Sequence, residues 1–172
     1  MTKHRNLFRG AITVWIKRKV NELVCKYGSN NPYELAEMLK IQVIHRNLHK
    51  EIMGFYFYDR RNKYIFLNSN MNEIQMNFVC AHEVGHGVLH PKANTPFMRE
   101  KTLFSTNKIE AEANIFAVEL LIPDNSLHEY RNMNYSIYDI ARIHGVPPEL
   151  CSLKKLSNKG GVENVIMKRK IF

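Results

Sequence analysis

Residues 78–90 read FVCAHEVGHGVLH and contain two histidines four residues apart. The apolar segment around this stretch predicts a helix over residues 72–90, which Pro91 ends. Residues four apart lie on one face of a helix, so His82 and His86 present two imidazole nitrogens to the same point. That arrangement suits Zn²⁺, and Glu83 lies near enough to act as general base on a water at the ion. The pattern therefore predicts a catalytic zinc site.

The residues around these histidines carry further information. Gly85 and Gly87 each cost a helix about 1 kcal/mol relative to alanine, which predicts that another segment approaches the helix closely at these positions. His90 continues the four-residue series, but a straight helix drifts by about 40° every four residues. We therefore expect His90 to support a ligand or to cap the helix, and not to bind the metal itself.

A catalytic zinc ion needs a third protein ligand. Leu89 and Lys92 stand where the three-histidine class of zinc site needs glycine and histidine, so that class is excluded. The segment KIEAEANIFAVELLIP, residues 108–123, predicts a second helix, which supplies glutamate instead. On helix geometry we expect Glu110 as the third ligand, with Asn114 one turn later in hydrogen-bonding reach of a ligand histidine. Glu112, which points about 160° away, is the alternative.

The remaining patterns predict an α+β fold with a small antiparallel sheet packed on these two helices. Expected are helices at about 11–26 and 32–40, a strand at 41–45, a hairpin of 54–58 and 63–68, a loop at 91–106, and short helices from Ser136 and from Pro147 or Pro148. We expect residues 1–125 to form one domain and residues 126–172 a small helical region packed on it or appended to it. One hairpin strand is expected to be an exposed edge that binds a substrate as an added strand.

Composition limits the possible functions. The chain has 172 residues and a net charge of +9, and its basic residues are scattered along the sequence. We find no nucleic-acid-binding motif and no apolar run of the roughly 20 residues that a membrane helix needs. Three widely spaced cysteines and the absence of a secretory signal fit a reducing cytoplasm. No oxyanion-stabilising residue can be assigned, although Tyr56, Tyr58 and Tyr64 are candidates.

The two motifs together resemble the ImmA/IrrE family of metallopeptidases, in which HExGH is followed, after a loop, by ExxAxxFAxxLLxP. The matching positions are His82, Glu83, Gly85, His86, Glu110, Ala113, Phe116, Ala117, Leu120, Leu121 and Pro123. The sequence GFYFYDRRNKYIFLNSN at 54–70 also resembles the family's lead-in, so the resemblance covers about residues 30–125. It implies a zincin fold of the gluzincin type with Glu110 as third ligand.

The resemblance also implies a biological role. Short members of the family look like antirepressor proteases of prophages and integrative elements, which cut a repressor that carries a helix-turn-helix domain. We therefore predict a zinc-dependent endopeptidase with such a repressor as its partner, and direct DNA binding is not expected. One alternative is a non-catalytic zinc protein that only holds the repressor. The other is a DNA-binding regulator that uses the basic surface and the helices at 136–156.

Overall fold

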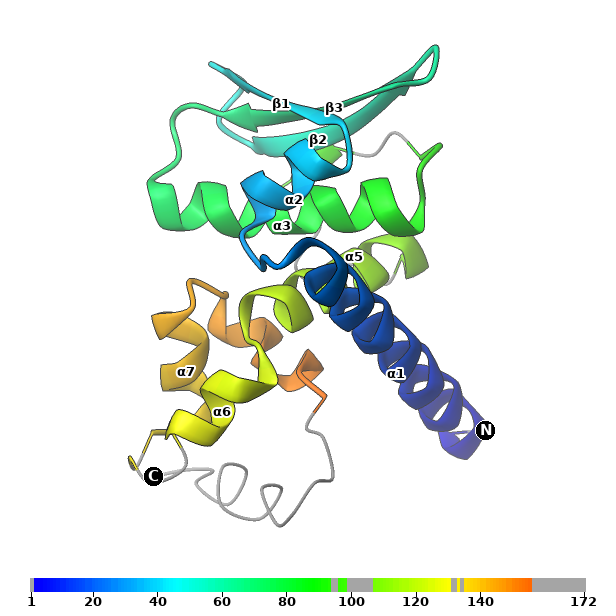
Figure 1. The fold of residues 1–172 in the computed structure, drawn as a ribbon, viewed down its shortest axis with the longest axis vertical. Coiled ribbons are helices and arrows are strands. Elements are labelled where there is room, and N and C mark those ends of the chain that lie inside the picture. The colour runs from blue at the N-terminus through cyan, green and yellow to red at the C-terminus, as the bar shows by residue number, and fades with distance from the viewer. Residues whose placement is uncertain (1, 94–95, 99–106, 131–132, 134, 156–172) are drawn as a thin grey trace.

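The computed structural model describes residues 2–93, 96–98, 107–130, 133 and 135–155, and Figure 1 shows their arrangement. In chain order the elements are α1 (Thr2–Tyr27), α2 (Pro32–Met38), β1 (Ile41–Arg46), β2 (Ile52–Asp59), β3 (Asn62–Asn68), α3 (Glu73–Leu89), β4 (Pro96–Met98), α5 (Lys108–Leu121), α6 (Asp124–Glu129), α7 (Ile137–Ile143) and a 3-10 helix (Pro148–Leu153). The α+β class is confirmed.

The sheet is mixed, and the prediction of a purely antiparallel sheet is wrong. Its strand order is β1-β3-β2-β4, with β1 parallel to β3 and β2 antiparallel to both of its neighbours. The sheet is mixed because β3, the second hairpin strand, lies between β1 and β2. β1 runs parallel to β3, whereas β2 runs antiparallel to it. The hairpin turn places Arg60 and Arg61 at φ values of 46° and 73°. Two positive values in succession are typical of the tight turn that matches the twist of the strands.

Two further sequence predictions concern the edges of the sheet. The segment 91–106 was expected to be a loop, but its described part includes β4, whose backbone pairs with β2. That pairing joins residues more than 40 positions apart, so no local pattern signals it. In the strand order β1 lies outside β3 and β4 lies outside β2, so β3 is not an edge strand among the described residues. β4 pairs with β2 only over residues 52–55, so the expected free edge is excluded there and stays a prediction for residues 56–59.

Helix α3 lies at the centre of the molecule, with the sheet on one side and α5 across the other (Figure 1). The two glycines of α3 mark both contacts, as predicted. A Cβ atom on Gly85 would lie 3.1 Å from the Phe116 side chain of α5. A Cβ atom on Gly87 would lie 2.9 Å from Ile41 of β1 and 3.1 Å from Tyr56 of β2. Small residues thus let both layers approach the helix closely.

Most helix ends lie where the sequence placed them, because local side chains cap them. Asn31 accepts hydrogen bonds from two backbone N–H groups of α2. Asn72 with Gln75, and Ser136 with Asp139, form reciprocal capping boxes at the starts of α3 and α7. The differences are that α1 begins at Thr2 and not near residue 11, that α6 was not predicted, and that the last helix is of the 3-10 type.

A buried ion network joins α1, α5, α6 and the end of the described chain. It comprises Lys17, Glu119, Asp124 and Lys154. Lys154 Nζ lies 2.6 Å from Glu119 Oε2 and 3.0 Å from Asp124 Oδ1, and Lys17 Nζ lies 2.7 Å from the same Asp124 atom. The backbone N–H of Lys155 donates to the second oxygen of Glu119 over 2.7 Å. Residues 154–155 are thereby fixed against the core.

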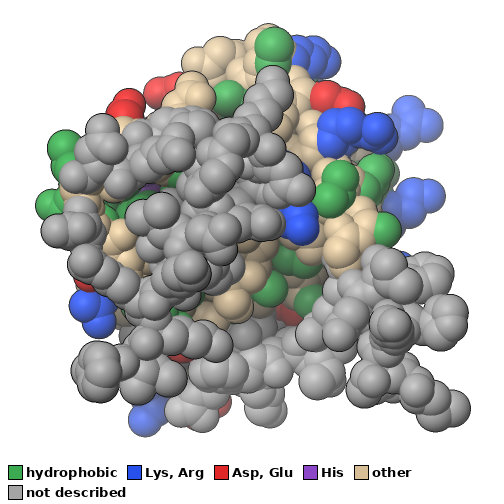
Figure 2. Space-filling model, turned by 90° about the horizontal axis from the view of Figure 1, so that it is seen from below, with side chains coloured by type: hydrophobic (Ala, Val, Ile, Leu, Met, Phe, Trp, Pro, Cys, Tyr) green, Lys and Arg blue, Asp and Glu red, His purple; other side chains and the backbone are tan. Residues whose placement is uncertain are grey.

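No helix in the described parts of the chain is both long enough and apolar enough to span a membrane. On the face shown in Figure 2, several described lysine and arginine side chains gather toward the upper right, and others stand apart at the lower left.

Candidate metal centre

The centre begins with His82, Glu83 and His86 on the buried middle of α3, all of which are at most 1% exposed. The two imidazole rings meet edge to face, with centroids 4.7 Å apart. Their Nε2 atoms lie 3.0 Å from each other. The four-residue spacing therefore converges on one point, as helix geometry requires.

Glu110, in the first turn of α5, completes a three-residue cluster. Its two carboxylate oxygens each lie 3.4 Å from a histidine nitrogen, Oε2 from His82 Nε2 and Oε1 from His86 Nε2. The donor atoms of these three residues lie within 4.8 Å of one another. We call His82, His86 and Glu110 the metal cluster.

Asn114, one turn further along α5, fixes the orientation of His82. Its Oδ1 lies 3.0 Å from His82 Nδ1. An amide oxygen only accepts hydrogen bonds, so Nδ1 carries the proton and Nε2 keeps its lone pair. Burial lowers the pKa of His82 to about 4, which leaves the ring neutral at neutral pH. The ring thus presents a lone pair to the centre of the cluster.

These observations test whether the cluster fits a metal ion. Burial alone would raise the pKa of Glu110, but the two imidazole rings beside it lower the pKa, so this side chain is a carboxylate at neutral pH. A carboxylate and two imidazole nitrogens therefore face one another in a buried space, and a cation there would offset their mutual repulsion. Two nitrogens and one oxygen are also donors that zinc accepts in catalytic sites. The residues fit a zinc ion.

Glu83 lies next to this cluster in a different electrostatic state. Burial raises the pKa of its carboxyl well above the ordinary value, and the negative charge of Glu110 adds to the rise. The backbone N–H of Tyr56 faces the carboxylate and works in the opposite direction. A carboxylate with a raised pKa takes up a proton more readily than an exposed one, which is the property that a general base requires.

The structure also separates the two glutamates between which the sequence left a choice. Glu112 Oε2 lies 2.9 Å from His90 Nε2, and its other oxygen lies 3.7 Å from Lys108 Nζ. Glu112 thus contacts the end of α3, whereas Glu110 contacts both cluster histidines. His90 is the C-cap residue of α3 and donates its backbone N–H to the carbonyl of His86 over 2.8 Å. Its side chain pairs with Glu112.

Sequence reasoning did not identify the contribution of Tyr56 to the site. This residue is fully buried, and its hydroxyl donates to the Pro91 carbonyl over 3.0 Å. Its backbone faces Glu83 and its ring covers Gly87. A hairpin strand with strong β-forming residues was predicted at 54–58, but nothing in it signalled which backbone group would face the carboxylate.

Comparisons with known proteins agree with this geometry. Residues 36–154 match the peptidase family described as the IrrE N-terminal-like domain. The chain is 58% identical over 149 residues to immunity region protein 2 of Bacillus phage phi105, covering 87% of this chain and 94% of the relative. It is 31% identical over 158 residues to metallopeptidase ImmA of Bacillus subtilis strain 168, covering 91% and 92%.

Proposed function

This chain belongs to the IrrE N-terminal-like family of metallopeptidases, and on that premise we propose that it is a zinc-dependent endopeptidase of the gluzincin type. His82, His86 and Glu110 bind the ion, and Glu83 is the general base. The observation that carries this proposal is the convergence of two Nε2 atoms and one carboxylate, 3.0–3.4 Å apart, beside a buried glutamate.

The residues divide the work of peptide hydrolysis among them. When bound, zinc supplies Lewis-acid chemistry that activates water and polarises the scissile carbonyl. Asn114 holds His82 with its lone pair toward the ion. Glu83 takes the proton of the attacking water and passes it to the leaving amine, and such general acid–base help is typically worth about 10²–10⁴-fold in rate.

The substrate we propose is a transcriptional repressor with a helix-turn-helix domain. One relative is named as a phage immunity region protein and another as metallopeptidase ImmA. The resemblance to short family members that cut such repressors supports this choice of substrate. We also place the protein in the cytoplasm, where the three free thiols of Cys25, Cys80 and Cys151 would stay reduced.

Glu83→Gln tests the proposal, because it removes the base and keeps the shape of the side chain. The variant should bind one zinc ion per chain, measured by metal analysis, yet leave a co-expressed repressor uncut. The repressor encoded nearest to this gene is the first substrate to test. Glu112→Gln is the matched control and should cleave normally.

The outcomes separate the proposal from its rivals. Full cleavage by Glu83→Gln would refute the role of the base. A wild-type protein that binds zinc and the repressor without cutting it would instead be a holding protein. Steep salt-dependent affinity for one DNA sequence would indicate a DNA-binding regulator.

A further inference from the structure

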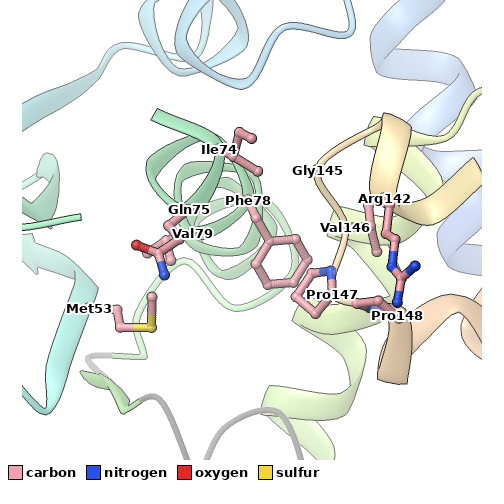
Figure 3. A pocket seen from close by; sticks show the side chains of 10 residues that line it. All are labelled: Met53, Ile74, Gln75, Phe78, Val79, Arg142, Gly145, Val146, Pro147 and Pro148. Carbon is pink, nitrogen blue, oxygen red and sulfur yellow. The ribbon is translucent and has the colours of Figure 1, made fainter. Parts of the chain in front are cut away.

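A cavity of about 320 Å³ lies between the first half of α3 and the segment that joins α7 to the 3-10 helix (Figure 3). One wall comes from β2 and α3, with Met53, Phe78 and Val79. The opposite wall comes from the C-terminal region, with Val146 and two prolines. The described lining residues are Met53, Ile74, Gln75, Phe78, Val79, Arg142, Gly145, Val146, Pro147 and Pro148.

Two elements, α3 and β2, each have one residue in the wall of this cavity and another residue at or near Glu83, the candidate general base. On α3, Val79 lines the cavity and Glu83 follows four residues later on the same face, about 6 Å along the helix. On β2, Met53 lines the cavity, and the backbone of Tyr56 three residues later faces Glu83. Strand geometry makes that distance about 10 Å. The cavity is therefore about two to three residues of extended peptide away from the centre.

The C-terminal wall is held rigidly. Gly145 has a φ of +69°, and the backbone N–H groups of Gly145 and Val146 donate to the carbonyls of Arg142 and Ala141 at the end of α7. This pattern closes the helix with two hydrogen bonds. A Cβ atom on Gly145 would lie 3.1 Å from Ile74, so the wall rests directly on α3.

The side chains that line the cavity make its middle apolar, which favours an apolar ligand. Pro147 and Pro148 have no backbone N–H, so this wall carries no donor at these positions that would need a partner. In Figure 3 the ring of Phe78 lies close to Pro147, while Gln75 lies toward Met53 on one side and the Arg142 guanidinium lies beside Pro148 on the other. The middle of the cavity is thus apolar, with one polar side chain toward each end.

We propose that this cavity binds a large apolar side chain of the substrate, next to the scissile bond. Residues 142–148 are then a specificity-determining part of the enzyme and not an appendage to it. This inference rests on the proposed function, because it takes the bond to be cut at the metal cluster. A volume of 320 Å³ is at the lower end of the range for ligand sites, which suits one side chain better than a longer peptide segment.

The test measures binding, so that it does not depend on turnover. Peptidyl hydroxamates carry a zinc-chelating group, and the side chain beside it can be glycine, leucine or phenylalanine, on the amino or the carboxyl side of the chelator. Affinity for the zinc-loaded protein is measured by calorimetry. In one of the two series, leucine should bind about tenfold to a hundredfold more tightly than glycine, as expected for burying such a side chain.

Variants of one wall residue link this preference to the cavity. Val146→Phe fills the cavity and should abolish the advantage of leucine while leaving the affinity of the glycine compound unchanged. Val146→Ala enlarges the cavity and should shift the preference from leucine toward phenylalanine. Val20→Ala is the matched control, since Val20 in α1 is equally buried and lies outside the described lining.

Each result decides between the hypotheses. Equal affinity for all side chains in both series, or a leucine advantage that survives in Val146→Phe, would overturn the cavity assignment and leave the zinc site intact. Failure of the wild-type protein to take up zinc would refute the proposed function, and the cavity assignment would fall with it.

Discussion

Helix α5 carries a buried carboxylate near each end, and the two have opposite surroundings. Near its start, Glu110 faces His82 and His86, and burial keeps His82 neutral at neutral pH. Near its end, Glu119 faces the ammonium group of Lys154 at 2.6 Å. The same residue type on one helix therefore serves an electron-rich cluster at one end and a neutralised ion network at the other.

This difference separates a binding site from a structural contact. In the ion network, Lys17 and Lys154 supply two positive charges to the negative charges of Glu119 and Asp124. Nothing further is needed to balance that charge. The metal cluster gathers lone pairs and a carboxylate with no lysine or arginine ion pair to Glu110 among the described residues. The comparison predicts that substitutions at the two ends have different consequences.

The largest expected effect is on the stability of the ion network. Lys154→Met leaves Glu119 buried without its closest cation, and breaking a buried pair in this way typically costs about 3–5 kcal/mol. Urea denaturation of the zinc-loaded protein measures the loss. The double variant Lys154→Met/Glu119→Leu should recover most of it, and a double variant as unstable as the single one would contradict this account.

The next effect concerns the metal cluster. Glu110→Gln should lower zinc affinity by about 10²–10³-fold. This estimate takes a binding free energy of about 10–16 kcal/mol for a protein-bound zinc ion and divides it equally among four ligands. Competition with a chromogenic chelator measures the affinity. Glu112→Gln changes the same side chain two residues away and should alter zinc affinity less than threefold, roughly. Equal losses in both variants would show that the geometry around Glu110 has been misinterpreted.

A smaller effect is expected at Asn114. Asn114→Ala removes the hydrogen bond to His82 Nδ1 and frees the ring to adopt the other tautomer. Residues that orient a metal ligand are typically worth about 10–100-fold in affinity. The same competition assay applies, and an unchanged affinity would remove Asn114 from the centre.

The smallest expected effect is the dependence of stability on pH that His144 contributes. Burial lowers the pKa of His144, the positive charge of Lys154 lowers it further, and Glu129 works against both. The folded state thus disfavours the proton that the unfolded chain accepts, so stability should fall as pH drops below about 6.5. His144→Gln should flatten this slope in urea denaturation between pH 7 and pH 5. An identical slope in both proteins would assign it to other groups.

Local patterns were sufficient to predict most elements and most of the centre. The helix of His82 and His86 and the second helix with Glu110 follow from spacing and periodicity, which act over a few residues. The role of the glycines in close packing followed from their cost to a helix. What the sequence left open was the choice between Glu110 and Glu112, since the two point in different directions and the face of the helix that meets its partner is unknown.

The features that could not be predicted all depend on distant residues. The mixed sheet, the pairing of β4 with β2 and the ion network join segments that are far apart in the chain. So does the cavity between α3 and residues 142–148. Helix and turn preferences are local energies, so the order of residues contains them directly. Which backbone edge, charge or apolar wall meets another is set by packing of the whole chain, and it becomes visible only when the layers are assembled.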